Sequence, residues 1–597
     1  MGEGPDHTRP QWGPQPLGHG TTRFALWAPD QPSLSLRTPS GDLPMQGADG
    51  GWFTIDTDAV APGEGYGFVL PDGFCVPDPA ARAQMGNVHG LSKLIEHGAY
   101  QWQTDWQGRP WHETVIMELH IGTFTPEGTY RAAIEKLDHL VAAGVTAIEL
   151  LPLAQFGGNR GWGYDGVLLY APHNTYGTTD DLKALVDAAH ARGLMVFLDV
   201  VYNHFGPDGN YLGKYASRFF DADRDTPWGA AIAFDEAAVR DFFIGNPLYW
   251  LSEFRFDGLR FDAIDHIRDP SERHILVEMA MAIRTRFDRP VHLHTEDERN
   301  VIFLHPYENG TPTLFTGEWN DDYHNVIHPI ATGESEGYYG DFVDNRWGKL
   351  ARALTEGFIF QGEPSKMHDN TPRGVPSAGQ PLTAFVVFNQ NHDQVGNRAF
   401  GDRLITLTTR EMLAALTAVH LLTPQIPLLW MGEEWGETNP FCFFTDFAGD
   451  LAAAVRKGRR NEFAKFDAFV DPNTREDIPD PNEIATFAMS RIDWTKPQTP
   501  DGAEWLALYS GLLKARADHI VHRLKDIAPY AGRIIEAADG VVRVAWTMGD
   551  GATMTMLFNA SDAAVPLPAG QLVAAVEAGT LTDKPTGGPL STVVTLS

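Results

Sequence analysis

The chain has 597 residues, of which 43% are hydrophobic and 21% charged, a composition typical of a globular protein with a large core. Its length corresponds to about three to four domains. The formal net charge of -32 argues against a nucleic-acid partner, because such a partner requires a basic footprint. The charge is compatible with a neutral substrate such as a sugar.

The N-terminus and the cysteines indicate where the protein works. Its first residues, MGEGPDHTRPQWGPQPLGHG, lack the basic start and apolar core of a secretory signal. No apolar run reaches the roughly 18 residues that span a bilayer. Only Cys75 and Cys442 are present; we expect two buried free thiols, and one long-range bridge is the alternative. We therefore predict a cytoplasmic protein, monomeric or homodimeric, with no membrane partner.

Short alternating runs near the N-terminus predict a small antiparallel β-sandwich. Runs such as TRFALWAP and GWFTIDT, between residues 21 and 75, are separated by Pro-Asp and Asp-Gly turns. A proline-rich connector, PDGFCVPDPAARAQ, follows them. We assign residues 1–100 to an N-terminal β-sandwich domain.

Between about residues 112 and 435, short apolar runs alternate with helical stretches. Eight runs are strand candidates: VIMEL, TAIELLPL, LMVFLDV, GLRFD, VHLHT, TLFTG, AFVVFN and IPLLWM. Gly144 and Gly193 stand where helices should end. The helices themselves are expected around residues 129–143, 179–192, 236–254 and 271–287. This alternation fits an α/β fold, a parallel (β/α)8 TIM barrel, with a doubly wound open sheet as the alternative.

The C-terminal part of the chain again shows strand patterns. The runs VVRVAWTM, ATMTMLFNAS, QLVAAVEA and STVVTLS predict a small β-sandwich. We therefore predict a barrel domain with a helical extension at 101–525 and a C-terminal β-sandwich at 526–597. The basic run RKGRR (456–460) is interpreted as a solvated helix face with no role in nucleic-acid binding.

Polar residues gather where the predicted barrel strands end, the edge at which barrels carry their active sites. Strand three ends in DVVYNH (199–204), strand four in Arg260 and Asp262, strand five in Glu296, and strand seven in His392 and Asp393. Two facing carboxyl groups of unequal ionisation are what glycoside cleavage requires. We expect Arg260 to keep Asp262 ionised. Glu296 has no cation immediately beside it on its strand face and is expected to stay protonated.

Each of these features alone has a structural explanation. An Arg–Asp pair two residues apart on a strand is usually an ion pair that serves folding. A lone glutamate at a strand end commonly caps a helix or is solvated, and DVVYNH alone could ligate a metal or cap a loop. Their joint occurrence at successive strand ends favours catalysis.

Four segments resemble the four motifs of the α-amylase family, glycoside hydrolase family 13, in order and in strand placement. The segments are DVVYNH (199–204), GLRFDAIDH (258–266), HTEDERN (294–300) and FNQNHD (388–393). The resemblance implies a retaining mechanism in which Asp262 is the nucleophile and Glu296 the general acid/base. It implies that Asp393 holds sugar hydroxyls. No metal or other cofactor is expected, since Asn203 matches the family's calcium position only loosely.

The same resemblance implies a set of sugar-binding residues. His204 and His392 match histidines that bind the sugar at the cleavage subsite, Arg260 matches an arginine that supports the nucleophile, and Tyr164 matches a tyrosine that stacks on that sugar. For the aromatic residues Trp162 and Trp319, sugar binding and plain packing are equally expected. The residues after strand six are candidates for recognising the leaving sugar: Trp319, Asp321, Asp322 and Tyr323.

Further stretches resemble one hydrolytic branch of the family. These are NHFGPDGNYLGKY (203–215), EWNDDYHNVIH (318–328), NQNHDQVGNRAFGDR (389–403), GEEWGETNPFCFFTDF (432–447) and RKGRRNEF (456–463). The N-terminal sandwich followed by ELHIGTFT resembles the wider branch that holds glycogen-branching, debranching and trehalose-forming enzymes. The resemblance to the hydrolytic branch implies hydrolysis of the α-1,4 bond next to the terminal trehalose unit of a maltooligosyl trehalose, an α-glucan substrate. The alternatives are a glucan branching enzyme, which transfers the glycosyl group, and a non-catalytic glycan-binding protein.

Overall fold

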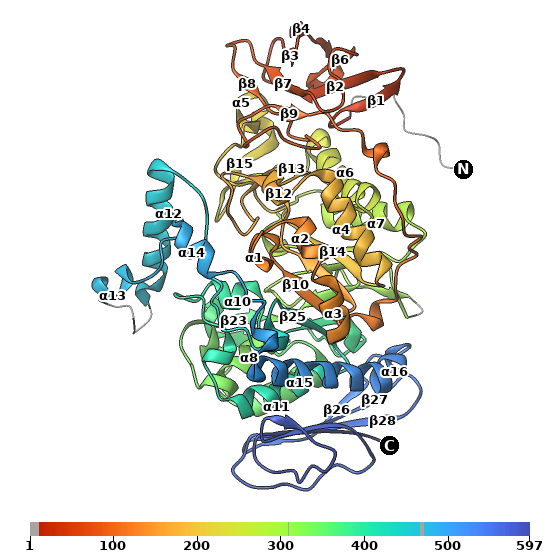
Figure 1. Cartoon of the computed structure of the whole chain (residues 1–597), viewed down its shortest axis with the longest axis vertical. Coiled ribbons are helices and arrows are strands. Elements are labelled where there is room, and N and C mark those ends of the chain that lie inside the picture. The colour runs from red at the N-terminus through yellow and green to blue at the C-terminus, as the bar shows by residue number, and fades with distance from the viewer. Residues whose placement is uncertain (1–10, 309, 466–467, 469–470) are drawn as a thin grey trace.

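A closed barrel of eight parallel strands forms the centre of the computed structural model, which describes residues 11–308, 310–465, 468 and 471–597 (Figure 1). Its strands are β10 (Ile116–Leu119), β11 (Ala147–Leu150), β14 (Met195–Val200), β17 (Gly258–Phe261), β18 (His292–Thr295), β21 (Gly317–Trp319), β24 (Phe385–Val387) and β25 (Ile426–Trp430). The last strand pairs with the first, and this closure confirms the predicted (β/α)8 barrel and excludes an open sheet.

The barrel strands are buried on both faces, which explains their nearly continuous apolar sequences. The interior is filled by large side chains such as Trp111, Phe197 and Phe388. Some of the polar residues in this core are paired across the barrel, as Glu149 is with His294. Strand six differs from its prediction, because β21 begins at Gly317, the last residue of the TLFTG run.

The predicted helices surround the barrel, with one change. The stretch expected around 129–143 forms two helices, α2 (Tyr130–Ile134) and α3 (Leu137–Ala143), separated at Glu135–Lys136. Gly144 ends α3 with a φ of 102°, a left-handed conformation that favours glycine. The other three predicted helices are α4 (Thr179–Ala191), α6 (Ala237–Glu253) and α7 (Ile275–Arg286).

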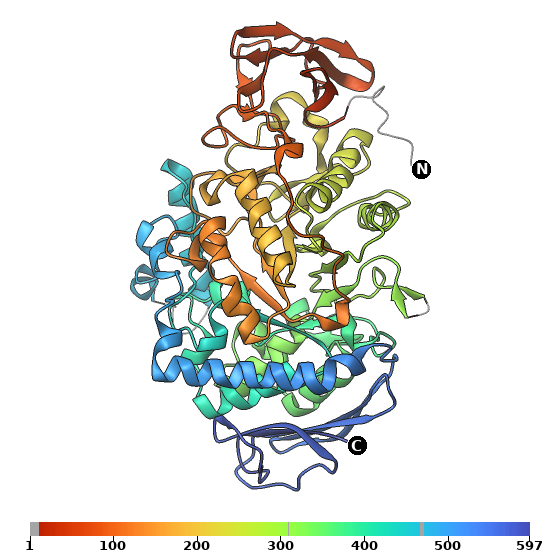
Figure 2. The ribbon, with the colours of Figure 1, turned by 45° about the vertical axis from the view of Figure 1, so that its right-hand side comes forward.

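Sheets flank the barrel at both ends of the molecule (Figures 1 and 2). The N-terminal strands form two antiparallel sheets: β1 (Gln15–Gly18), β2 (Thr21–Trp27), β6 (Trp52–Thr57) and β5 (Gln46–Ala48) in one; β4 (Gly41–Pro44), β3 (Ser35–Thr38), β7 (Gly65–Val69), β8 (Cys75–Val76) and β9 (Ser92–Lys93) in the other. Together they make the expected sandwich. The domain bounds 1–100, 101–525 and 526–597 stay predictions.

The C-terminal strands are hydrogen-bonded into one antiparallel sheet. Its order is β26 (Gly532–Ala538), β27 (Val541–Thr547), β28 (Thr553–Asn559), β31 (Ser591–Leu596), β29 (Gln571–Glu577) and β30 (Thr580–Leu581). Helices α9 (Arg346–Glu356) and α11 (Arg410–Leu422) pack against it. In the predicted β-sandwich this layer would be a second sheet. Instead, the two helices cover the sheet and connect it to the barrel.

A helical arm follows the last barrel strand and stands out to the left in Figure 1. It contains α12 (Gly449–Glu462), α13 (Pro472–Glu476) and α14 (Ile484–Met489). The RKGRR run lies in α12, and the side chains of Arg456 and Lys457 are exposed as expected. Arg459 is not exposed: its side chain is 6% accessible, so the interpretation of the whole run as a solvated face is wrong at this position.

Two expectations about the chain as a whole can be compared with the structure. Cys75 and Cys442 are both free thiols. Within the part of the chain that the structure describes, no helix is both long enough and apolar enough to cross a membrane.

Candidate active site

The buried guanidinium of Arg260 holds the ends of three neighbouring barrel strands together. Its Nη1 donates to Asp199 Oδ2 at 2.7 Å and to Asp262 Oδ1 at 2.8 Å, and its Nη2 donates to Glu296 Oε2. The Arg260 side chain is fully buried, whereas those of Asp262 and Glu296 are 12% and 19% exposed. Solvent therefore reaches the two carboxyl groups but not the cation that binds them.

The backbone after β17 is shaped around Glu296. Ala263 adopts a left-handed conformation with a φ of 38°, which costs an alanine of order 1–3 kcal/mol. This conformation directs the Ala263 N–H to Glu296 Oε2 at 3.1 Å. The Glu296 N–H in turn donates to the Phe261 carbonyl at 3.0 Å. The strained residue thus fixes the orientation of one carboxyl group beside the other.

Burial dominates the ionisation of both carboxyl groups. It raises the pKa of Asp262 to about 7 and that of Glu296 to about 8, against the lowering effect of Arg260. Asp262 also raises the pKa of Glu296, whereas Asp199 raises that of Asp262. The expectation that Glu296 has no adjacent cation is wrong, because Arg260 contacts it directly. Arg260 lowers the pKa of both groups, so it does not by itself separate an ionised Asp262 from a protonated Glu296.

Asp393 lies in the first turn of the short helix α10 (His392–Gly396). Asn391 and Gln394 form a capping box that starts this helix. The Asp393 carboxylate accepts a hydrogen bond from Asn397 at 3.2 Å, and its side chain is 35% exposed. Asp393 raises the pKa of Asp262 and of Glu296, so the three predicted carboxyl groups are close enough to interact.

Tyr164 and His392 form the wall beside this trio. The Tyr164 hydroxyl donates to Asp199 Oδ2 at 2.6 Å and contacts His392 Nε2 at 2.8 Å, with the two rings stacked. On its other side His392 binds Glu118 through Nδ1 at 2.5 Å. Burial lowers the pKa of His392, but Glu118 and Asp393 outweigh it and raise the pKa to about 9.

Glu118 is a site residue that the sequence interpretation missed. It belongs to β10 and is fully buried. Both of its carboxylate oxygens accept hydrogen bonds from His392, one from the backbone N–H and one from the ring. The sequence feature that could have indicated a role for Glu118 is its position as an acidic residue inside the apolar run VIMEL.

His204 lies against an aromatic residue that no motif pointed to. Its ring stacks on Trp228, with centroids 4.3 Å apart and planes at 7°. Trp228 is 48% exposed and lies in the connection between β15 (Phe220–Thr226) and β16 (Gly229–Ile232). His204 itself is buried and contacts Asn203 Oδ1 through Nδ1. The predicted histidine is therefore placed beside an exposed indole.

Three predicted sugar-binding residues have no open face. Trp162 is buried against His392 and Phe441 and donates to the Cys442 carbonyl. Trp319 lies beneath Arg260, whose guanidinium is 4.1 Å from the ring centroid. Asp322 is fully buried, and both of its oxygens accept hydrogen bonds from protein donors: Arg373, Asn300, Ile359 and Phe360. The geometry of these three residues argues against direct contact with sugar.

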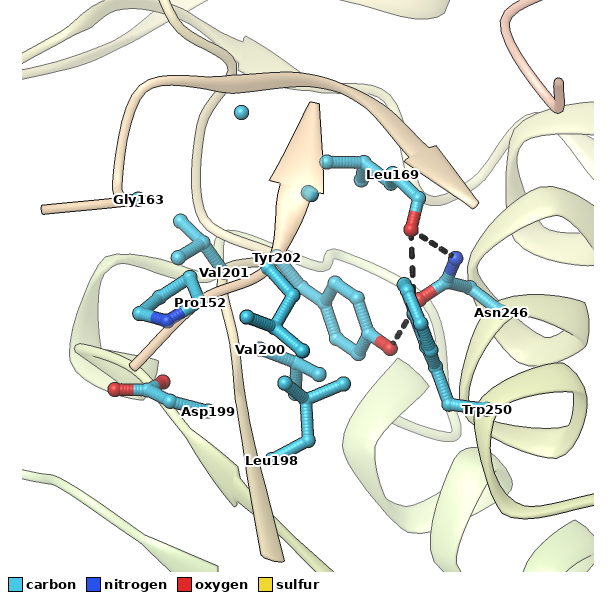
Figure 3. Close-up of a pocket in the computed structure, with 13 residues that line it drawn as sticks. Pro152, Gly163, Leu169, Leu198, Asp199, Val200, Val201, Tyr202, Asn246 and Trp250 are labelled. Carbon is cyan, nitrogen blue, oxygen red and sulfur yellow. Dashed lines mark hydrogen bonds between the residues drawn. The ribbon is translucent and has the colours of Figure 1, made fainter. Parts of the chain in front are cut away.

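A small cavity lies behind β14, on the other side of the strand from the carboxyl groups. It measures about 20 Å³, enough for one water molecule, and is lined by Tyr202, Asn246 and Trp250 (Figure 3). The Asp199 carboxylate points away from these residues (Figure 3). Among the described residues, no three His, Cys, Asp or Glu side chains gather as a possible metal-ligand set.

The fold and this arrangement of carboxyl groups define a barrel glycosidase of the α-amylase class. The family model for the alpha amylase catalytic domain matches residues 69–248. A Salmonella typhimurium protein, crystallised as a candidate alpha amylase, is 51% identical and has a TM-score of 0.94, covering 98% of this chain and 99% of its own.

Two curated relatives are more specific. The malto-oligosyltrehalose trehalohydrolase of Deinococcus radiodurans is 42% identical over 517 residues, covering 85% of this chain and 83% of the relative. The Brevibacterium helvolum enzyme of the same name is 37% identical over 96% of this chain and 98% of its own length. The chain belongs to the α-amylase family, glycoside hydrolase family 13, and within it to the malto-oligosyltrehalose trehalohydrolases.

Proposed function

We propose that this protein hydrolyses the α-1,4-glucosidic bond next to the trehalose end of a malto-oligosyl trehalose and releases trehalose. The observation that carries this proposal is the shared guanidinium of Arg260, which holds Asp262 and Glu296 side by side at the barrel rim. Two carboxyl groups so arranged are the machinery of glycoside cleavage. The substrate follows from the names of the relatives that match most of the chain.

In the first step, the Asp262 carboxylate attacks the anomeric carbon of the glucose on the non-trehalose side of the bond. The bond from that carbon to the glycosidic oxygen breaks, and Glu296 gives its proton to the departing oxygen. Trehalose leaves, and the maltooligosyl group stays bound to Asp262 through an ester bond. The raised pKa of Glu296 suits it to donate a proton, and Arg260 favours the ionised form of Asp262.

In the second step, the Glu296 carboxylate accepts a proton from a water molecule while the water oxygen attacks the anomeric carbon. The ester bond breaks, the maltooligosaccharide leaves, and Glu296 is protonated again for the next cycle. Two displacements at one carbon retain its configuration, so the proposed mechanism is retaining.

The remaining groups would bind the sugar that is attacked. Asp393 is the most exposed of the three carboxyl groups and is proposed to hold sugar hydroxyls. The charged His392 can donate to the Tyr164 hydroxyl, and Tyr164 is proposed to offer its other ring face to the sugar. His204, beside Trp228, is proposed to bind the same sugar.

The alternative is glycosyl transfer to a second glucan. A 1,4-alpha-glucan branching enzyme of Pseudoalteromonas atlantica is 32% identical, but the match covers only 41% of this chain. Both reactions would use the same first step, so the carboxyl groups alone do not distinguish them. The longer and stronger matches to trehalohydrolases favour water as the acceptor.

One experiment tests the proposal against its alternative. The enzyme is incubated separately with maltotriosyl trehalose and with amylose, and free trehalose and new α-1,6 branch points are measured. We expect trehalose release from the first substrate and no branching of the second. Branch formation on amylose without trehalose release would overturn the proposal. The cytoplasmic location, the monomeric or homodimeric state and the absence of a nucleic-acid partner stay predictions from the sequence.

A further inference from the structure

A fourth carboxyl group, that of Asp321, lies beside the catalytic trio. It is the first residue of helix α8 (Asp321–Thr332), which directly follows β21. In the barrel, β21 lies between β18, which leads to Glu296, and β24, which leads to Asp393. The end of β21 therefore places Asp321 between these two carboxyl groups.

The start of α8 turns two neighbouring acids in different directions. Successive residues of a helix point about 100° apart, so Asp321 and Asp322 cannot share one environment. Asp322 faces the protein and is saturated with hydrogen bonds. Asn320 fixes this start, since its backbone N–H donates to the Val386 carbonyl at 2.8 Å and its side chain to Gly357. Asp321 is thereby held on the side of the carboxyl cluster.

Asp321 is partly exposed and incompletely paired. Its Oδ1 accepts a hydrogen bond at 3.3 Å from Gln394, the residue next to Asp393. No other side-chain hydrogen bond of Asp321 is made by the residues that the structure describes. Burial, Glu296 and Asp393 together raise the pKa of Asp321 well above its ordinary value. Its second oxygen is therefore available to a ligand within the same electrostatic cluster.

The order of the strands indicates which part of the substrate would reach this oxygen. The nucleophile and the acid act on opposite sides of the anomeric carbon, so the leaving sugar lies on the side of Glu296. Asp321 follows the strand next to that of Glu296 and is separated from Asp262 by that strand, so it lies nearer to the acid, which protonates the departing oxygen, than to the nucleophile. We propose that Asp321 is a specificity-determining residue whose free carboxyl oxygen hydrogen-bonds a hydroxyl of the departing trehalose unit. This inference rests on the proposed function and assigns a residue to its leaving-group side.

A pair of substrates separates this role from general catalysis. Maltotriosyl trehalose has a trehalose leaving group, whereas 4-nitrophenyl α-maltotrioside has an aryl group with no hydroxyls to bind. For Asp321→Asn and Asp321→Ala we expect kcat/KM on maltotriosyl trehalose to fall about 3- to 10-fold, the range for losing one uncharged hydrogen bond. On the aryl substrate kcat/KM should change less than about twofold. Equal losses on both substrates, or no loss on either, would overturn the inference.

Product inhibition gives an independent measurement on the same variants. Added trehalose occupies the leaving-group side, so its inhibition constant should rise about tenfold in Asp321→Asn, while that of maltotriose stays unchanged. An unchanged constant for trehalose contradicts the inference. A wild-type enzyme that releases no trehalose from maltotriosyl trehalose would refute the proposed function instead, whatever the variants do.

Discussion

Asp262 and Glu296 are bound by the two terminal nitrogens of one guanidinium, that of Arg260. This arrangement brings two carboxyl groups together without giving either a cation of its own. Because both are buried, their pKa values are raised to about 7 and about 8 rather than lowered by the arginine. The cation therefore sets the distance between the carboxyl groups more than their ionisation.

The first prediction is a bell-shaped pH dependence of kcat/KM. Asp262 must be ionised to attack, so activity should rise with pH through about 7; Glu296 must be protonated to donate, so activity should fall above about 8. The two limbs belong to the coupled pair, not to either residue alone. The profile is measured on maltotriosyl trehalose, and the absence of an alkaline limb up to about pH 9.5 would contradict the prediction.

The second prediction separates the roles of the two carboxyl groups. Asp262→Ala should lower turnover by several orders of magnitude on every substrate, because no ester can form. Glu296→Gln should lower turnover of maltotriosyl trehalose by about 10²- to 10⁴-fold, since its leaving oxygen needs a proton. Formation of the glycosyl-enzyme from an aryl glycoside should be affected far less, because nitrophenolate leaves unprotonated. A burst of nitrophenol with Glu296→Gln measures this step.

Circular dichroism and thermal unfolding of both variants serve as the control for folding. If Asp262→Ala kept most of its activity, another residue would have to be the nucleophile. A Glu296→Gln variant without a burst would remove that residue from the role of acid.

The third prediction concerns Glu118, which holds His392 from inside the barrel. Glu118→Gln should lower the pKa of His392, because the carboxylate is a main cause of its elevation. In the wild type this pKa is raised from 6.5 to about 9, so its contribution to stability is complete below about pH 6.5 and is lost as the pH rises through 9. The unfolding temperature of the wild type should therefore fall across this range, and that of Glu118→Gln should fall less. If the unfolding temperatures of the two proteins fell in parallel with pH, Glu118 would not be the cause of the raised pKa of His392.

The clustering of the three candidate carboxyl groups could be predicted because they lie beyond the carboxyl ends of barrel strands. Asp262 and Glu296 directly follow buried strands, and Asp393 lies six residues after the end of a third, β24. Each of them alone has a structural explanation, but three at one edge of the barrel favour a shared site. Closure of the eight strands could be expected from their alternation with helices, although only the pairing of β25 with β10 excludes an open sheet.

The remaining features depend on strand register, helix starts and long-range contacts, which the spacing of residues in the sequence does not specify. Arg260 and Glu296 are on different strands, so their contact depends on the register between β17 and β18. Asp321 and Asp322 are adjacent and chemically identical, and only the helix start decides which one faces the site. Trp228 belongs to a connection with no motif, and its stacking on His204 is a long-range contact.

The last prediction concerns Arg459, which joins the helical arm to the helix that carries Asp393. Its Nη2 donates to the Gly396 and Arg398 carbonyls at 2.8 and 2.9 Å, at the C-terminal end of α10. Arg459→Gln should loosen α10, displace Asp393 and raise KM about tenfold, with a smaller change in kcat. Arg460 is the matched control, because it contacts Glu476 within the arm and not α10.

The same substitution, to glutamine, should therefore have different effects at Arg459 and at Arg460. Amide exchange in residues 392–398 should be faster in Arg459→Gln than in the wild type, because their carbonyl anchors are lost, and unchanged in Arg460→Gln. Arg459→Lys should recover only part of the loss, since an ammonium group lacks the planar fork that reaches two carbonyls at once. If both glutamine variants raised KM equally, the arm would act through its general stability and Arg459 would have no positioning role.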